Sequence, residues 1–344
     1  MVGGGTPDTT VKSYWGGDIQ WFTPSEIGKN KYVDFSLRTI TRDGLDNSSA
    51  KLLPLHTILL SSRATVGECS IASNECTTNQ GFQSLIAKQC NIDFLYYLIQ
   101  TKKKDLIRNA CGSTFLEISA NEIRKIKVAV PVQNEQEQIA KLLSLVDERI
   151  ATQNKIIEKL QSLIKGLRVC CMQRVYGNNV YLSEIAQIYQ PQTISSTELT
   201  EDGFLVYGAN GIIGKYKDYN HETEQICITC RGNTCGMVNY TKPMSWITGN
   251  AMVINTDKYQ DKVCKRYLYH YLSAYNFNSI ISGSGQPQIV RTPLEKLKIT
   301  LPTISEQKQK AIIFDKIQDK IDINHKVLNL YIGQKQYLLR QMFI

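Results

Sequence analysis

The sequence predicts an α/β (α+β) fold in which two similar globular domains are separated by a pair of long antiparallel coiled-coil helices. Three observations predict it. The chain repeats itself at an offset of 171 residues, a heptad pattern follows the conserved end of each repeat, and the remainder of each copy mixes short apolar strands with short helices. A period this long indicates duplicated domains, because stacked repeats have periods of about 20–50 residues.

The repeat is free of gaps from Gly112 and Gly283 onward. Lys-Ile-Lys-Val at 125–128 coincides with Lys-Leu-Lys-Ile at 296–299, and both copies then continue through a proline to a Glu-Gln pair. The total of 344 residues is about two periods. The predicted segments are a first domain at 1–130, a first helix at 131–175, a second domain at 176–301 and a second helix at 302–344.

Within each domain, an apolar strand runs directly into an arginine and a tight turn. Residues 57–61 lead to Arg63, and residues 225–229 lead to Arg231. Further along the chain come the glycine-containing segments 79–82 and 249–252, each leading into another apolar strand, and then short buried helices expected at 94–98 and 267–272. The second domain also has a glycine-bounded turn at 208–214, ahead of its strand and arginine. Trp15, Trp21 and Trp246 are expected to be core residues.

The helical segments carry apolar residues at alternating spacings of three and four, which is typical of helices that pair. One polar residue interrupts each series, and these two residues align with each other, which favours two helices with a fixed mutual register. Two ordinary amphipathic core helices are the alternative. A helix of about 40 residues is roughly 60 Å long. The expected pairing residues are Ile139, Leu143, Val146, Ile150, Gln153, Ile157, Leu160, Phe314, Ile317, Ile321, Asn324, Leu328 and Tyr331.

Composition bounds the function. The net charge of +9 permits a polyanionic partner without requiring one. No apolar run approaches the roughly 20 residues needed to cross a bilayer, and the N-terminal residues lack a signal peptide, so we expect a cytoplasmic protein without a membrane role. Cys227, Cys230 and Cys235 are spaced suggestively, but the first copy has no counterpart. Reduced thiols are therefore expected, with no metal site.

The sequence lacks the motifs of a catalytic protein. It contains no GxxxxGK[ST] phosphate loop and no Asn-Pro-Pro-aromatic tetrapeptide of the kind that amino-methyltransferases use. Glu306 and Lys308 resemble a fragment of a nuclease centre, yet the first copy has Glu137 in place of the lysine. The four histidines are scattered. We expect a binding protein that is not an enzyme and needs no cofactor.

The chain resembles the DNA-specificity subunit of type I restriction–modification enzymes over essentially its whole length. The resemblance rests on the segments 3–7 (Gly-Gly-Gly-Thr-Pro) and 14–24, on 63–67 and 79–82, and on the Pro131 to Ile139 segment. In the second half it rests on 207–214 and 246–251. It implies two target-recognition domains that each read half of a bipartite double-stranded DNA site, without catalytic activity of their own. It also implies helices that dock two methyltransferase (modification) subunits, with restriction (translocase/nuclease) subunits joining for cleavage.

Candidate DNA contacts are polar and basic residues of the paired turns, since arginine can bind guanine, and asparagine or glutamine can bind adenine, through two hydrogen bonds. Residues shared by both copies are expected to serve as scaffold or phosphate contacts, because the two halves should read different bases. Gln286 and Gln288, which the second copy has where the first copy carries residues such as Thr114 and Glu117 in the same loop, are better candidates for specificity. The full set is Arg63, Thr65, Asn79, Gln80, Ser113, Thr114, Asn210, Lys215, Arg231, Asn233, Ser284, Gln286 and Gln288.

Two other functions stay open at this point. One is the equivalent subunit of a type II-like system whose single partner fuses nuclease and methyltransferase. The other is a coiled-coil scaffold with no DNA role. The copies also differ in one respect: the second begins with residues 180–188, Val-Tyr-Leu-Ser-Glu-Ile-Ala-Gln-Ile, and nothing equivalent precedes Met1. We therefore expect either that the chain starts late or that the first domain lacks an edge element.

Overall fold

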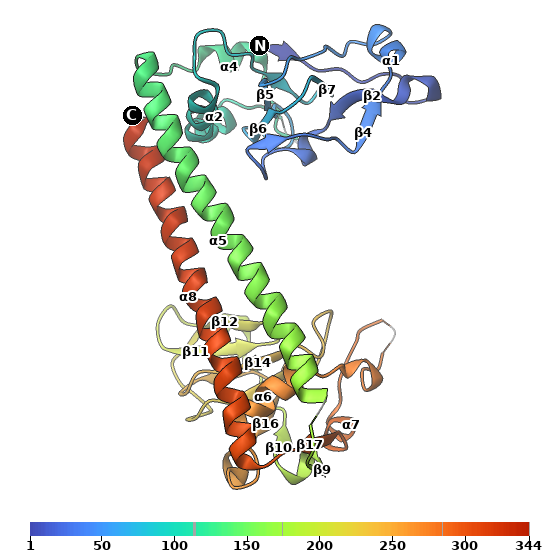
Figure 1. The fold of residues 1–344 in the computed structure, drawn as a ribbon, viewed down its shortest axis with the longest axis vertical. Helices are drawn as coiled ribbons and strands as arrows, with labels where there is room; N and C mark the ends of the chain where they lie inside the picture. The colour runs from blue at the N-terminus through green and yellow to red at the C-terminus, as the bar shows by residue number, and fades with distance from the viewer. Residues whose placement is uncertain (113–114, 174, 284, 344) are drawn as a thin grey trace. The chain divides into compact units, whose positions relative to one another are not determined.

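The computed structural model describes residues 1–344 except 113–114, 174, 284 and 344. It confirms the mixed α/β class. Contacts divide the chain into two compact units, the first formed by Met1–Gln153 with Val327–Ile344 and the second by Asn154–Lys326. Each unit therefore combines one globular part with a section of each long helix (Figure 1). The four-segment division of the sequence stays a prediction.

The first unit carries small sheets with the strand orders β4-β2-β7, β3-β6-β5 and β1-β8. Helix α2 covers the apolar strand β5, and both belong to one buried cluster. The strands are β1 (Val2–Gly3), β2 (Trp15–Phe22), β3 (Tyr32–Val33), β4 (Arg38–Ile40), β5 (Ile58–Leu60), β6 (Cys69–Ala72), β7 (Cys76–Thr78) and β8 (Gln83–Ser84). The short helices are α1 (Arg42–Asp46), α2 (Ile92–Thr101), α3 (Lys103–Arg108) and α4 (Ala120–Lys125).

The second unit has sheets with the orders β10-β16-β13-β14, β12-β11-β15 and β17-β9. The strands are β9 (Asn178–Tyr181), β10 (Gln187–Tyr189), β11 (Phe204–Gly208), β12 (Gly211–Tyr216), β13 (Ile226–Thr229), β14 (Val238–Tyr240), β15 (Trp246–Ile247), β16 (Ala251–Asn255) and β17 (Lys298–Leu301). The short helices are α6 (Lys265–Ala274) and α7 (Arg291–Glu295).

The predicted buried strands and short helices are confirmed. Every residue of β5 and of β13 is buried. Both strands have unbroken apolar runs rather than alternating ones, because both of their faces are covered. Helix α2 contains the predicted 94–98 segment and α6 contains 267–272. The glycine-bounded segment 208–214 forms the antiparallel β11–β12 hairpin.

The long helices are α5 (Gln133–Gln173) and α8 (Ile304–Met342). A glutamine of the repeated Glu-Gln pair fixes the start of each. Oε1 of Gln136 accepts from the Asn91 amide at 2.9 Å, and its Nε2 donates to the Pro131 carbonyl at 2.8 Å. Gln307 does the same with Cys264 at 2.8 Å and Pro302 at 3.0 Å. Each helix is thereby tied to the N-terminus of its own unit's α2 or α6.

Inside each unit, the two long helices pack against each other. In the first, Ile139 and Leu143 share a cluster with Leu338 and Leu339, and Lys335 Nζ lies 2.7 Å from Asp147 Oδ1. In the second unit, Ile157 is buried, and Leu160, Phe314, Ile317 and Ile321 belong to or border the main core. Val146 and Gln153 are also buried, whereas Ile150, Asn324, Leu328 and Tyr331 are half-buried. Their assignment as a continuous coiled-coil seam stays a prediction.

Candidate nucleic-acid interface

In the first unit, a strained turn follows β5 and presents Arg63 to solvent. Ala64 has a φ of +63°, a conformation unusual for a residue with a side chain. Its amide donates to the Leu116 carbonyl at 2.9 Å, which ties the turn to the loop that contains Leu116. The Thr65 hydroxyl lies 2.9 Å from the buried Ser61 hydroxyl. Tertiary contacts, rather than local preference, therefore hold Arg63 in place.

Four of the six candidates of the first domain line one surface hollow. Arg63, Thr65, Asn79 and Gln80 surround it together with the exposed ring of Phe115. Oδ1 of Asn79 accepts a hydrogen bond from the Gly81 amide at 2.9 Å, so this side chain stabilises the turn to which it belongs. Gln80 Oε1 accepts from the Thr6 hydroxyl. The other two candidates, Ser113 and Thr114, lie outside the described residues.

The second unit builds the equivalent turn after β13. Gly232 has a φ of +83° and donates its amide to the Pro287 carbonyl at 3.0 Å. Arg231 and Gln288 form an isolated β-bridge. Asn210, at the tip of the β11–β12 hairpin, accepts a hydrogen bond from Thr234. These contacts bring Asn210, Arg231, Asn233 and Gln288 together at one surface.

The two turns have the same construction. Arg63 pairs with Glu117 in a β-bridge just as Arg231 pairs with Gln288. The next amides also match, because Ile118 donates to Ser62 at 2.8 Å and Ile289 donates to Cys230 at 3.0 Å. Each unit therefore presents an arginine, followed by a left-handed residue, against a second loop of its own.

The chemistry of the paired residue separates the two sites. In the first unit, Arg63 Nε lies 3.7 Å from Oε2 of Glu117, with both side chains about half exposed. In the second unit, an uncharged glutamine takes the place of Glu117. Across the described ranges, Arg231 has no carboxylate within 4.0 Å, so its charge is not locally compensated. The two sites therefore offer different hydrogen-bonding groups on one shared frame.

The structure separates some candidates from the others. Lys215 lies on β12, where its Nζ is 3.4 Å from Asp202. Gln286 is exposed near Gln288, whereas Ser284 lies outside the described residues. The candidate set from the sequence omitted Glu117 and Phe115. The sequence signal that points to Glu117 is its alignment with the candidate Gln288, and the structure places both residues opposite the shared arginine.

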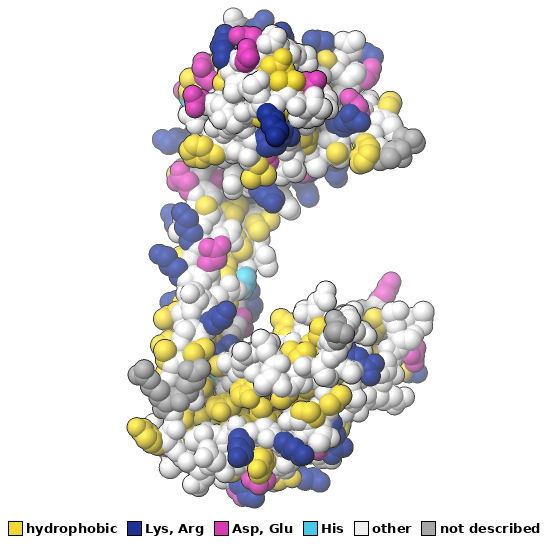
Figure 2. All heavy atoms as spheres, turned by 90° about the vertical axis from the view of Figure 1, so that its right-hand side faces the viewer, with side chains coloured by type: hydrophobic (Ala, Val, Ile, Leu, Met, Phe, Trp, Pro, Cys, Tyr) yellow, Lys and Arg dark blue, Asp and Glu magenta, His cyan; other side chains and the backbone are white. Residues whose placement is uncertain are grey.

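The tryptophans lie in or near the cores rather than in the turns. Trp21 is buried, and its Nε1 donates to the Gly5 carbonyl at 2.9 Å. Trp15 and Trp246 are only half-buried. Trp15 packs under Arg38, whose guanidinium carbon lies 3.6 Å from the ring centroid. Lys and Arg side chains are scattered over both units on the face drawn in Figure 2 rather than collected in one band.

The cysteines of the second unit are structural in position. Cys227 lies within β13, and burial raises the pKa of its thiol. In the part of the chain that the structure describes, no group of three His, Cys, Asp or Glu side chains is placed to hold a metal ion. Nor does any helix in the described ranges combine the length and apolar character that would let it cross a membrane.

Comparison with known proteins identifies the family. A profile described as the type I restriction modification DNA specificity domain matches residues 2–162 and again residues 178–330. The chain belongs to the type I restriction–modification DNA specificity family. The two matches confirm that this specificity chain contains two copies of the domain.

Relatives in that family are named specificity subunits. The chain is 40% identical to the MjaIX specificity subunit of Methanocaldococcus jannaschii over 171 residues, which are 46% of this chain and only 39% of that subunit. It is 27% identical to the EcoprrI specificity subunit of Escherichia coli over 91% of this chain and 84% of that subunit. The crystal structure of a type I S subunit from M. genitalium has the same fold, with a TM-score of 0.63 and 18% identity over 98% and 99% of the two chains.

Proposed function

We propose that this specificity chain is a non-catalytic reader of double-stranded DNA. Each unit reads one half of a bipartite, asymmetric site, and the long helices dock two methyltransferase subunits. Restriction subunits join the assembly for cleavage, and the complex works in the cytoplasm. The observation that carries the proposal is the turn built twice on one frame, with Glu117 opposite Arg63 in one unit and Gln288 opposite Arg231 in the other.

This arrangement suits the reading of two different half-sites. The arginines and the turns around them are shared, and a shared cation is suited to phosphate, which carries no sequence information. Position 117 or 288 differs in hydrogen-bonding character. Glutamate accepts from the amino group of cytosine, whereas glutamine bonds adenine through both its donor and its acceptor. The shared arginine turn therefore fixes how each unit approaches the DNA backbone, and the residue at position 117 or 288 contributes to the choice of base.

Exposed apolar side chains on the long helices support the docking of a protein partner. Scattered exposed hydrophobic residues are ordinary, but these recur on both helices in both units. In the first unit they are Leu142, Leu145, Leu330 and Tyr337. In the second unit they are Ile156, Leu163, Ile312 and Ile323. Because each unit offers one such set, the helices can take two copies of the partner, which matches two methyltransferase subunits.

The test is genome-wide detection of methylated adenine in cells that keep the modification partner intact. Deleting the gene should abolish methylation of one split motif. Two reciprocal variants, Glu117→Gln and Gln288→Glu, should each alter the bases of one half of that motif and leave the other half unchanged. Gln309→Ala, at an exposed helix position, is the matched control. An unchanged methylome after deletion would overturn the DNA-reading proposal and favour a scaffold.

The nature of the partner is tested separately. Co-purification of the intact chain with a separate methyltransferase polypeptide supports a type I assembly, whereas a single polypeptide with both nuclease and methyltransferase domains would show the type II-like alternative. Leu145→Asp together with Leu163→Asp should weaken either association, because a charge at an apolar contact loses its hydration. Lys141→Gln with Lys159→Gln, at exposed polar positions of α5, lowers the net charge by the same two charges and is the control.

A further inference from the structure

Each unit has a loop beside its arginine turn, and the two loops have the same construction. Glu117 forms a β-bridge with Cys111 in the first loop, and Gln288 forms one with Ser282 in the second. The same two residues also bridge the arginines of their own units. The described positions of one loop are therefore structurally equivalent to those found 171 residues further along the chain in the other.

Phe115 and Gln286 occupy equivalent positions in these loops. Each directly precedes a residue whose carbonyl accepts a hydrogen bond from the arginine turn, Leu116 at 2.9 Å and Pro287 at 3.0 Å. Both side chains are exposed, and 60% of the surface of Phe115 is accessible. At one position of a shared loop, the first unit thus offers an apolar ring where the second unit offers an amide.

The Phe115 ring lines the hollow that also holds Arg63, Asn79 and Gln80. It belongs to none of the hydrophobic clusters of the described residues, so core packing does not account for a large apolar side chain at this position. The polar groups around it have partners within the unit. Arg63 lies against Glu117, Asn79 accepts from a backbone amide, and Gln80 accepts from a threonine hydroxyl. The exposed ring adds an apolar contact that these polar groups cannot make.

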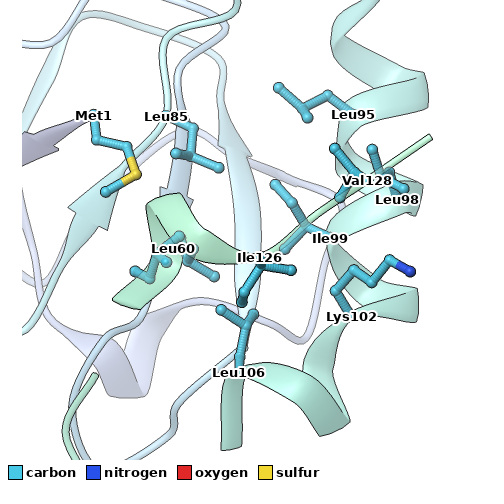
Figure 3. A pocket seen from close by; sticks show the side chains of 11 residues that line it. Met1, Leu60, Leu85, Leu95, Leu98, Ile99, Lys102, Leu106, Ile126 and Val128 are labelled. Atoms are coloured by element: carbon cyan, nitrogen blue, oxygen red, sulfur yellow. The ribbon is translucent and has the colours of Figure 1, made fainter. Parts of the chain in front are cut away.

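A second hollow of the first unit has a different character. Its volume is about 180 Å³, and apart from Lys102 all of its lining side chains are apolar, among them Leu95, Ile99 and Ile126 (Figure 3). Among the described residues, none lines both this cavity and the hollow beside Arg63. Contacts to DNA are made mainly by polar and basic groups. The ring beside the arginine, rather than the apolar cavity, is therefore placed to make an apolar contact with a base.

The chemistry of the major groove identifies the group that such a ring would contact. The apolar group that the bases present there is the C5 methyl of thymine, and phenylalanine is among the side chains that contact it. The other base edges in the groove carry donors and acceptors, which a phenyl ring cannot satisfy. Glutamine at the equivalent position instead binds adenine through a donor and an acceptor.

We propose that Phe115 is a specificity-determining residue that reads the C5 methyl group of a thymine in the half-site of the first unit. This inference rests on the proposed function, because it requires the first unit to contact base edges in the major groove. Gln286 supplies no apolar ring at the equivalent position. A dependence on Phe115 should therefore be confined to one half of the bipartite site.

The test measures binding of the full chain, in complex with its methyltransferase partner, to a duplex that carries the split motif. Each thymine of the motif, on either strand, is replaced in turn by deoxyuridine, which removes the methyl group and leaves the base pairing unchanged. One replacement in the half-site of the first unit should weaken binding about fourfold, the effect expected for one buried carbon group of this size. In Phe115→Ala the same replacement should have no effect, because the ring that contacts the methyl group is gone.

Two variants complete the design. Gln286→Ala, at the equivalent position of the second unit, is the matched control and should leave the fourfold effect intact. Phe115→Leu keeps a smaller apolar side chain and should retain part of the effect. Because Phe115 is exposed, Phe115→Ala should melt at the same temperature as the parent chain, which shows that the variant is folded.

The outcomes distinguish this inference from the proposed function. If the complex selects the motif but the parent chain and Phe115→Ala respond equally to every deoxyuridine, the thymine assignment is overturned while DNA reading stands. A uniform loss of affinity in Phe115→Ala, whichever thymine is replaced, would also overturn it and make the ring a general contact, such as a wedge between base steps. A parent complex that does not distinguish the motif from unrelated DNA would overturn both.

Discussion

His270 Nε2 lies 2.8 Å from Oδ1 of Asp315, inside the junction between α6 and α8 in the second unit. Nδ1 of the same ring lies 2.9 Å from an Nη of Arg168. A guanidinium can only donate, so Nδ1 is the acceptor and Nε2 carries the proton. At the equivalent position of the first unit, Tyr97 donates to Asp147 at 2.7 Å. The repeated junction is thus built with a titratable imidazole in one copy and a phenol in the other.

This difference predicts a pH-dependent stability that resides in the second unit. Burial lowers the pKa of His270 from its ordinary value of 6.5, although the bond to Asp315 opposes the shift. As pH falls below about 6.5, the unfolded chain binds a proton that the native chain does not. The free energy of unfolding therefore falls, by up to about 1.4 kcal/mol per pH unit, until the native pKa is reached.

Urea denaturation of the full chain at pH 7.5, 6.5 and 5.5 checks this. His270→Gln keeps an acceptor for Arg168 and a donor for Asp315, so it should fold and show a shallower pH slope. The slope that remains should come from His221, whose pKa burial also lowers. An identical slope in His270→Gln and in the parent chain would contradict the assignment.

The glutamines at the starts of α5 and α8 should contribute far more to the free energy of unfolding than the exposed residues near them. Gln307→Ala leaves the Cys264 amide and the Pro302 carbonyl buried without their partner, and each such group costs about 1–3 kcal/mol. We expect a comparable loss for Gln136→Ala in the first unit. Gln309→Ala, at an exposed position of the same helix, should change the unfolding free energy by less than about 0.5 kcal/mol. Hydrogen exchange will show which unit each variant loosens.

Gly4 should control the shape of the first candidate turn. A Cβ at Gly4 would lie 1.9 Å from the Asn79 carbonyl oxygen and 2.4 Å from Thr78 Oγ1, so alanine there must displace the turn that leads to Gln80. The adjacent Gly3 has only Gln83 Nε2 within range, at 3.8 Å. Gly4→Ala should therefore lower the melting temperature and impair methylation of one half-site, whereas Gly3→Ala should do neither. Equal effects of the two variants would show that the turn does not depend on this contact.

Arg231 should contribute more to DNA affinity than Arg63. Glu117 already offsets the charge of Arg63 at 3.7 Å, whereas Arg231 faces the neutral Gln288. Arg231→Ala should weaken binding to all sequences and reduce the slope of log K against log salt by about 0.9, the value for one phosphate contact. Arg63→Ala should have a smaller effect on that slope. Arg42→Ala, on α1, is the control, and a loss confined to one DNA sequence would instead make Arg231 a base reader.

The sequence alone determined the repeat and the local structures that depend on it. Strands such as β5 and β13 follow from unbroken apolar runs. Helices α5 and α8 follow from a three–four spacing that contains no interior proline. These features depend on neighbours in the chain, and their length and periodicity make them readable. The paired arginines at 63 and 231 were visible for the same reason, since each directly follows its strand.

Only the tertiary structure decided which of the candidate residues meet. Glu117 forms a β-bridge with Arg63, and Gln288 forms one with Arg231. The residues of each pair are more than fifty positions apart in the sequence, and no local pattern encodes such a contact. Lys215 was a candidate by residue type, yet in the folded chain its Nζ lies 3.4 Å from Oδ1 of Asp202. The same is true of β9, whose place beside β17 depends on hydrogen bonds between distant backbones. Periodicity is a property of the segment, whereas a site is a property of the packing that brings segments together.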